Sequence, residues 1–190
     1  MSVAGLLLAA GAGSRMGRPK ALVELDGELL VERGIRLLAA GGCDPVVVVL
    51  GAEAEQVRRH CTGATVVVAA GWETGLGASL RAGLGALDAD ACVVALVDQP
   101  LVTAEAVRRL VGSDAIAAVA TYQGHPRNPV RLDRAVWADV AAAATGDGGA
   151  RSWLRAHPAL VVQVDCSDAG SPDDLDTPQD LAALTQKVDL

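Results

Sequence analysis

The sequence predicts an α/β protein, a three-layer Rossmann-like sandwich in which helices cover both faces of a mostly parallel sheet. Three observations support this fold class. Short apolar runs alternate with amphipathic segments along the chain, the pattern of parallel strands joined by crossover helices. The first run, 3–10, is almost wholly apolar, as expected for a strand buried on both faces. Glycine-rich turns follow several of the runs, at the edge of the sheet where such proteins bind ligands.

The first expected strand leads into a glycine-rich, basic loop. The strand closes in Leu8, Ala9 and Ala10. The loop then supplies three glycines, a serine and three cations: Gly11, Gly13, Ser14, Arg15, Gly17, Arg18 and Lys20. Glycines let a backbone approach a ligand closely, and clustered cations attract anions. The loop therefore predicts a polyphosphate site, with a solvated surface turn as the alternative.

Two common phosphate-binding loops do not fit this segment. A P-loop needs a Ser or Thr after its lysine, whereas Ala21 follows Lys20. A dinucleotide-binding loop needs a third glycine where Met16 stands, and the second strand ends in Gly51 without the acidic residue that would hold a ribose. We therefore expect neither a P-loop site nor a nicotinamide dinucleotide site.

The elements after the loop alternate between helix and strand. Apolar residues at helical spacing predict a helix within 28–40, which Gly41 and Gly42 end. A connector and three short elements complete this part of the chain: a connector at 21–26, a strand at 45–51, a helix at 53–60 and a strand at 64–70. A second glycine segment, with Gly75 and Ser79, then opens a helix to about residue 87. Its free amides and positive helix end also suit an anion; a serine-capped turn is the alternative.

A polar turn follows the fourth expected strand, 90–97. It places Asp98, Gln99 and Pro100 at the carboxyl end of that strand. A carboxylate beside a basic phosphate loop can hold Mg²⁺ against a triphosphate. Asp98 has an alternative role as a helix cap, but Thr103 can cap the next helix itself.

The chain from 103 to 164 continues the alternation. The expected elements are helices at 103–112, 134–144 and 151–156 and strands at 115–122, 130–132 and 160–164. We expect 123–129 to break regular structure and to face the substrate, with His125 and Arg127, although a lone loop histidine is often merely solvated. A further glycine turn carries Asp147 and Arg151, and either side chain is expected to face the site.

A cluster of acids precedes the last helix. Asp173, Asp174 and Asp176 come before Thr177 and Pro178, which are expected to cap and start that helix. Capping needs one such group, so the acids require another explanation. If Asp176 faces Asp98, the two carboxylates repel each other unless a cation lies between them. The need for a cation between these two carboxylates is the basis of the metal hypothesis.

The composition narrows the class of protein. Hydrophobic residues make up 51% of the 190 residues, which is enough for one domain over 1–190 with a core of aliphatic side chains. The formal net charge of −7 and the scarcity of aromatic residues argue against nucleic acid. We expect a cytoplasmic protein with no membrane partner, because no apolar run is long enough to span a bilayer. The four separated cysteines predict reduced thiols and neither a zinc site nor a disulfide framework.

Together these motifs resemble the nucleotidyltransferases of molybdenum-cofactor maturation, and within them the molybdenum cofactor cytidylyltransferases. Residues 9–20 match the signature Ala-Ala-Gly-x-Ser/Gly-x-Arg-Met-Gly-x-x-Lys at every fixed position. Guanylyl-transferring relatives usually have Leu-Ala-Gly-Gly there, so the resemblance favours CTP. The sequence departs from the family pattern at two places: Gln99 replaces a frequent Met, and residues 127–129 follow the 124–126 turn where an apolar run is expected. The second departure lies on the expected acceptor side and concerns the identity of the acceptor more than the reaction type.

The resemblance implies a fold of the nucleotide-diphospho-sugar transferase type. It also implies Mg²⁺-dependent transfer of a nucleotidyl group to the phosphate of an acceptor, molybdopterin, with release of pyrophosphate. It implies Arg15, Lys20 and Asp98 as catalytic residues and Asp98 and Asp176 as metal ligands. The nucleotide-binding residues it implies are Leu8, Ala9, Ala10, Gly11, Gly13, Ser14, Arg15, Lys20, Gly75, Ser79 and Asp98. The acceptor-side residues are Gln99, Pro100, His125, Arg127, Asp147 and Arg151. A client molybdoenzyme or its chaperone is the implied protein partner.

The sequence also raises rival functions. A guanylyltransferase would use GTP in place of CTP, and a sugar-1-phosphate or isoprenoid-precursor nucleotidylyltransferase would use the same chemistry on another acceptor. A non-catalytic accessory protein would bind a nucleotide but release no pyrophosphate. A nicotinamide-dependent oxidoreductase is excluded mainly by the failed dinucleotide fingerprint, and absence of NAD binding would settle the point.

Overall fold

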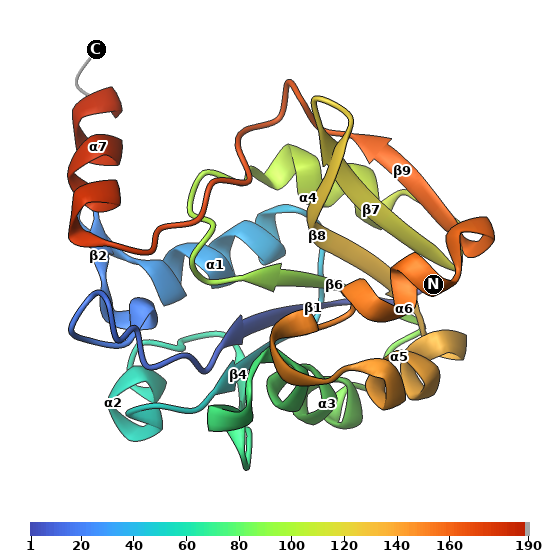
Figure 1. Ribbon diagram of the computed structural model, residues 1–190, viewed down its shortest axis with the longest axis horizontal. Coiled ribbons are helices and arrows are strands. Elements are labelled where there is room, and N and C mark those ends of the chain that lie inside the picture. The colour runs from blue at the N-terminus through green and yellow to red at the C-terminus, as the bar shows by residue number, and fades with distance from the viewer. Residues whose placement is uncertain (189–190) are drawn as a thin grey trace.

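A seven-stranded sheet forms the centre of the molecule (Figure 1). The structure is a computed structural model that describes residues 1–188, and the side chains of residues 1–184. The order of the strands across the sheet is β5-β4-β1-β6-β8-β7-β9. Their bounds are β1 Val3–Ala9, β4 Val46–Leu50, β5 Thr65–Val68, β6 Ala91–Leu96, β7 Ala117–Tyr122, β8 His125–Asp133 and β9 Val161–Asp165. A small hairpin of β2 Glu24–Leu25 and β3 Glu28–Leu29 lies apart from this sheet.

The sheet is mostly parallel, as the sequence predicts. Strand β1 pairs in parallel with β4 and β6, β4 pairs with β5, and β7 pairs with β9. The exception is β8, which runs antiparallel to both β6 and β7. All seven residues of β1 are buried, which confirms that the first apolar run is a central strand.

Helices cover the two faces of the sheet (Figure 1). Their bounds are α1 Leu30–Ala40, α2 Ala54–Arg58, α3 Leu76–Ala86, α4 Ala104–Val111, α5 Trp137–Ala143, α6 Arg151–Ala156 and α7 Pro178–Val188. Side chains of α1 and α4 share one core with Leu7 of β1. Side chains of α3, α5 and α6 share the other core with Leu6. Neighbouring residues of β1 thus serve opposite faces, as the two-residue period of a strand requires.

The segment 123–129 departs from the sequence prediction. It was expected to be irregular, but His125 begins β8, and Gln123 and Gly124 form the tip of the β7–β8 hairpin with φ values of 53° and 79°. The proline-containing half of β8 pairs only with β7, because β6 pairs with β8 from Val130 onward. A proline is tolerated there because one side of the strand needs no ladder hydrogen bond.

Several other features agree with the sequence. Gly41 caps the end of α1, and the side chain of Thr103 caps α4 by accepting from the amide of Ala106 at 3.4 Å. All four cysteines are buried and free. The expected connector at 21–26 instead contains a 3₁₀ turn, Lys20–Leu22, and strand β2. Within residues 1–188, no helix combines the length and the apolar character needed to cross a bilayer.

Candidate active site

Three segments far apart in the sequence meet beyond the carboxyl end of β6. Lys20 begins the 3₁₀ turn after the glycine loop, Asp98 follows β6, and Asp176 precedes α7. The Lys20 ammonium donates to Asp98 Oδ2 at 2.8 Å and also to Asp176 Oδ1. The side chains of Lys20 and Asp98 are 17% and 23% exposed, so this contact is largely shielded from solvent, whereas Asp176 is 44% exposed.

Local hydrogen bonds hold the acidic segment against the end of β6. The amide of Leu175 donates to the carbonyl of Asp98 at 2.7 Å. The side-chain amide of Gln99 donates to Asp174 Oδ1 at 2.9 Å and to the carbonyl of Pro172 at 3.2 Å. The sequence predicts Asp98 and Asp176 as neighbours, and these bonds explain how the chain brings them together.

The start of α7 fixes the other end of this segment. Thr177 Oγ1 accepts from the amide of Asp180 at 3.2 Å, and Asp180 Oδ2 accepts from the amides of Asp176 and Thr177 at 3.0 and 2.8 Å. This reciprocal cap confirms Thr177 as the cap and Pro178 as the first helical residue. It leaves the carboxylate of Asp176 free to face Lys20.

The charges of this cluster perturb one another. Burial by itself lowers the pKa of Lys20, but the hydrogen bonds and charges of Asp176 and Asp98 outweigh it and raise the pKa above its usual 10.5. Burial raises the pKa of Asp174, and the nearby Asp98 and Asp176 add to that rise. Lys20 is therefore a firmly protonated cation between two carboxylates. The cation expected between Asp98 and Asp176 is supplied here by the chain itself.

The carboxylate pair fits a metal ion that is shared with a substrate. Among the described residues, no group of three or more His, Cys, Asp or Glu side chains is arranged to hold a metal. Mg²⁺ in proteins commonly takes one or two carboxylates and completes its shell with phosphate oxygens and water. Asp98 and Asp176 meet that requirement and would depend on a triphosphate for the remaining ligands.

A cavity of about 460 Å³ lies beside this cluster. Its lining comes from the glycine loop, the end of β6 and the start of α3: Leu8, Ala10, Gly11, Ala12, Gly13, Ser14, Lys20, Trp72, Glu73, Gly75, Leu76, Ser79, Leu96, Val97, Asp98 and Asp147. We call it the loop cavity. Most of the residues expected to bind the nucleotide line it. Ala9 is buried in β1 and is not part of the lining, and Arg15 is largely exposed, with Nη1 3.9 Å from Asp176 Oδ2.

Two glycines of the loop cavity are required by its backbone geometry. Gly13 has φ of 61°, and a Cβ there would collide with the carbonyl of Arg18. Gly75 has φ of 115°, and a Cβ there would lie 2.5 Å from the backbone of Gly146. The close contact at Gly75 brings the 146–149 turn against the start of α3, which places Asp147 at the edge of the cavity.

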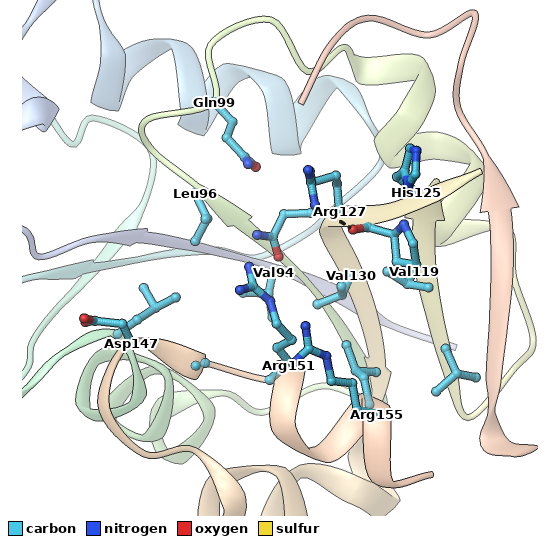
Figure 2. A pocket seen from close by; sticks show the side chains of 18 of the residues that line it. Val94, Leu96, Gln99, Val119, His125, Arg127, Val130, Asp147, Arg151 and Arg155 are labelled. Atoms are coloured by element: carbon cyan, nitrogen blue, oxygen red, sulfur yellow. Dashed lines mark hydrogen bonds between the residues drawn. The ribbon is translucent and has the colours of Figure 1, made fainter. Parts of the chain in front are cut away.

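A second cavity, of about 730 Å³, adjoins the first (Figure 2). Its lining includes side chains of β6, β7, β8 and α6 and of the 147–150 turn, and we call it the arginine cavity after Arg127, Arg151 and Arg155. Leu76, Leu96 and Asp147 line both cavities. Figure 2 shows Arg151 and Arg155 extending from α6 toward the strand that carries Arg127. The site thus consists of two adjoining cavities, with the Lys20 cluster at the loop cavity.

A family model described as the MobA-like NTP transferase domain matches residues 5–161. The chain belongs to this family. The matched region contains the glycine loop, Asp98 and the glycine turns at 71–75 and 146–149. Asp176 lies beyond it. The membership confirms the resemblance to the molybdenum-cofactor nucleotidyltransferases and the nucleotidyltransferase class of enzyme.

Curated relatives of this MobA-like chain carry different names. It is 40% identical to the nicotine blue oxidoreductase of Paenarthrobacter nicotinovorans, with 96% of each chain covered. It is 32% identical to the molybdenum cofactor guanylyltransferase of Rhodobacter capsulatus, with 99% of this chain and 97% of the relative covered. Among the solved structures, Rv0371c of Mycobacterium tuberculosis superimposes with a TM-score of 0.85 at 29% identity, with 98% of each chain covered.

The MobA-like fold brings most of the expected acceptor-side residues together. Gln99, His125, Arg127, Asp147 and Arg151 line the arginine cavity. Pro100 is buried beside them and is not part of the lining. The grouping of these five residues from β8, α6 and two turns was expected from the motifs, but their common cavity is visible only in the fold.

Several lining residues were not identified from the sequence. Trp72 lines the loop cavity and packs over Gly51; it directly follows Gly71 in the second glycine segment, which was a usable signal. Arg155 lines the arginine cavity four residues after Arg151, a spacing that places both on one helix face. In the sequence, the apolar residues on the floor of that cavity cannot be distinguished from ordinary core residues.

Proposed function

We propose that the protein is a Mg²⁺-dependent cytidylyltransferase that transfers CMP from CTP to the phosphate of a molybdopterin-type acceptor and releases pyrophosphate. The observation that carries this proposal is the cluster of Lys20, Asp98 and Asp176 at the edge of the glycine-loop cavity. A second, larger cavity adjoins it and offers room for the acceptor. A client molybdoenzyme or its chaperone would receive the product.

In the proposed reaction, a phosphate oxygen of the acceptor attacks the α-phosphorus of CTP. The bond between the α-phosphorus and the bridging oxygen to the β-phosphorus breaks, and its electron pair leaves with pyrophosphate. The acceptor needs no general base, because a phosphate monoester is already largely dianionic at neutral pH. The residues therefore contribute positioning and charge neutralisation.

Each part of the loop cavity has a role in this proposal. Lys20 and Arg15 neutralise charge on the triphosphate and on the departing pyrophosphate. The amides of the loop from Ala10 to Gly13 hold the base and phosphates, and Ser79 contacts the nucleoside. Asp98 and Asp176 are the residues that would hold Mg²⁺, which when bound would neutralise triphosphate charge. Ala10 stands where guanylyl-transferring relatives usually have glycine, and this difference favours CTP over GTP.

A thermal-shift series with CTP, GTP, UTP, ATP and NAD, each with and without Mg²⁺, tests nucleotide choice. A ligand present at a hundred times its Kd stabilises by about 2.7 kcal/mol, on the order of 5 to 10 °C for a chain of this size. We expect the largest Mg²⁺-dependent shift with CTP. A larger shift with GTP contradicts the choice of base but keeps the reaction class, and no shift with any triphosphate contradicts the nucleotide site.

One observation supports a second candidate function. The 40% identical relative from Paenarthrobacter nicotinovorans is named an oxidoreductase of nicotine blue, so reduction of a heterocyclic compound is the alternative. The missing third glycine at Met16 and the missing acid after β4 count against a dinucleotide site of the usual kind. Consumption of NADH or NADPH with such an acceptor, without pyrophosphate release from any triphosphate, would favour this alternative.

A further inference from the structure

The three arginines of the arginine cavity have no carboxylate partner among the side chains that the structure describes. Among the side chains of residues 1–184, none of Arg127, Arg151 and Arg155 forms an ion pair, and Arg127 donates only to the carbonyl of Pro126 at 3.4 Å. Many other arginines of the chain form ion pairs with acids: Arg33, Arg36, Arg58, Arg108, Arg109 and Arg134. Two acids, Asp147 and Asp174, also line this cavity, and Asp174 accepts a hydrogen bond from Gln99. The three guanidinium groups outnumber these acids and pair with neither among the described residues, so in a chain with a net charge of −7 they form a local site for an anion.

The elements that carry these arginines are regular and fixed by packing. Arg151 and Arg155 lie one turn apart on α6, whose Trp153 is buried in the core. Arg127 lies on β8, paired with Ala120 of β7. Side chains on helices and strands hold a ligand in a more defined position than side chains on loops. The cations are therefore part of a built site.

The rest of the cavity suits a ligand that is larger than a phosphate and partly apolar. Its floor is apolar, with Val94, Leu96, Val119 and Val130, and its volume of about 730 Å³ falls in the range of cavities that hold molecules of drug size. Gln99 is 5% exposed, and its Oε1 has no hydrogen-bond partner among the described residues. A ligand with an N–H or O–H group would satisfy that oxygen, since a buried acceptor without a donor is costly.

We propose that the arginine cavity binds a ring-bearing acceptor through a second anionic group, distinct from the phosphate that reacts beside Asp98. This inference rests on the proposed function and specifies its acceptor. The arginines line a cavity that neither Lys20 nor Asp98 lines, so the second anion and the reacting phosphate occupy different ends of the site. The site therefore selects a heterocyclic polyanion and disfavours a small polyol phosphate.

The test is direct binding of two fluorescent probes, pterin-6-carboxylate and uncharged 6-methylpterin, to the full-length protein without nucleotide. We expect the wild-type protein to bind the carboxylate about tenfold more tightly, a typical gain for a charge-assisted contact. In the double variant R151A/R155A this preference should fall to about one. In the matched variant R58A/R59A, which removes two charges at the C-terminal end of α2, it should be unchanged.

The outcomes separate this inference from the proposed function. Equal binding of the two probes by the wild-type protein, or a preference that survives in R151A/R155A, overturns the inference, as does the absence of binding of either probe. CTP binding measured on the same R151A/R155A variant shows that its loop cavity is intact. If CTP fails to bind the wild-type protein while the carboxylate preference holds, the proposed function fails and the anion site stands.

Discussion

The Lys20 cluster makes a specific prediction about metal affinity. The Lys20 ammonium donates to Asp98 Oδ2 at 2.8 Å and also to Asp176. These are the two carboxylates proposed to hold Mg²⁺. A metal ion that binds the protein without nucleotide must displace this ammonium. Replacing Lys20 with Met keeps a long side chain and removes the charge, so K20M should bind a divalent ion more tightly than the wild-type protein even though it loses transferase activity.

The expected size of this effect follows from the contacts. Two unit charges 4 Å apart interact by about 4 kcal/mol at an effective dielectric constant of 20. Exposure of Asp98 and Asp176, at 23% and 44%, reduces that figure because solvent screens exposed pairs. We expect a net change on the order of 1 to 3 kcal/mol, which corresponds to roughly tenfold to a hundredfold in the metal dissociation constant.

The assay is a titration with Mn²⁺ in the absence of nucleotide, followed by electron paramagnetic resonance of the free ion. The matched control is R18M, which removes an exposed cation from the same loop and should change the affinity little. In D98N the affinity should fall. A K20M variant that binds Mn²⁺ no more tightly than R18M would refute the reasoning that Lys20 competes with a metal.

Three further predictions concern the scaffold. G13A should weaken CTP binding at least tenfold in the thermal-shift series, because the αL conformation costs a non-glycine residue about 1–2 kcal/mol and the new Cβ collides with the Arg18 carbonyl; unchanged binding would contradict this. L7A should lower the urea unfolding free energy by about 2–5 kcal/mol, since Leu7 is fully buried, and a loss below 1 kcal/mol would argue against that packing. Burial raises the pKa of Cys43 from 9.0 to about 12, so its contribution to stability is present below pH 9 and is lost as pH rises toward 12. The urea midpoint of C43A should therefore fall less than that of the wild-type protein between pH 8 and 11, and parallel falls would contradict the shift.

The central part of the fold was predictable because its signals are local. The run of apolar residues in β1 and the glycines that end α1 act within a few residues, and both predictions are confirmed. The sequence predicted a strand at 130–132 but not the first part of β8, 125–129, because Pro126 and Pro129 usually exclude a strand. The structure accommodates them with a shift in register after Val119, which pairs with Val130 while Ala120 pairs with Arg127.

The site was predictable to the extent that motifs mark it. The glycine loop and Asp98 carry such motifs, and they meet in the structure. The position of Lys20 between Asp98 and Asp176 was not predictable, because the contacts span 78 and 156 residues of sequence. Whether Arg151 and Arg155 have acidic partners was not predictable either, because this depends on which acids the fold places near them.

The most direct test of the central claim is a transfer assay with mass spectrometry. The wild-type protein is incubated with CTP, Mg²⁺ and molybdopterin, and pyrophosphate and the cytidylylated acceptor are quantified, with D98A as the inactive control. We predict equimolar pyrophosphate and CMP-bearing acceptor, and a rate reduced about 10²- to 10³-fold in D98A. Absence of any nucleotidylated product with CTP and with GTP, or equal rates for the wild-type protein and D98A, would contradict the proposed role of this site.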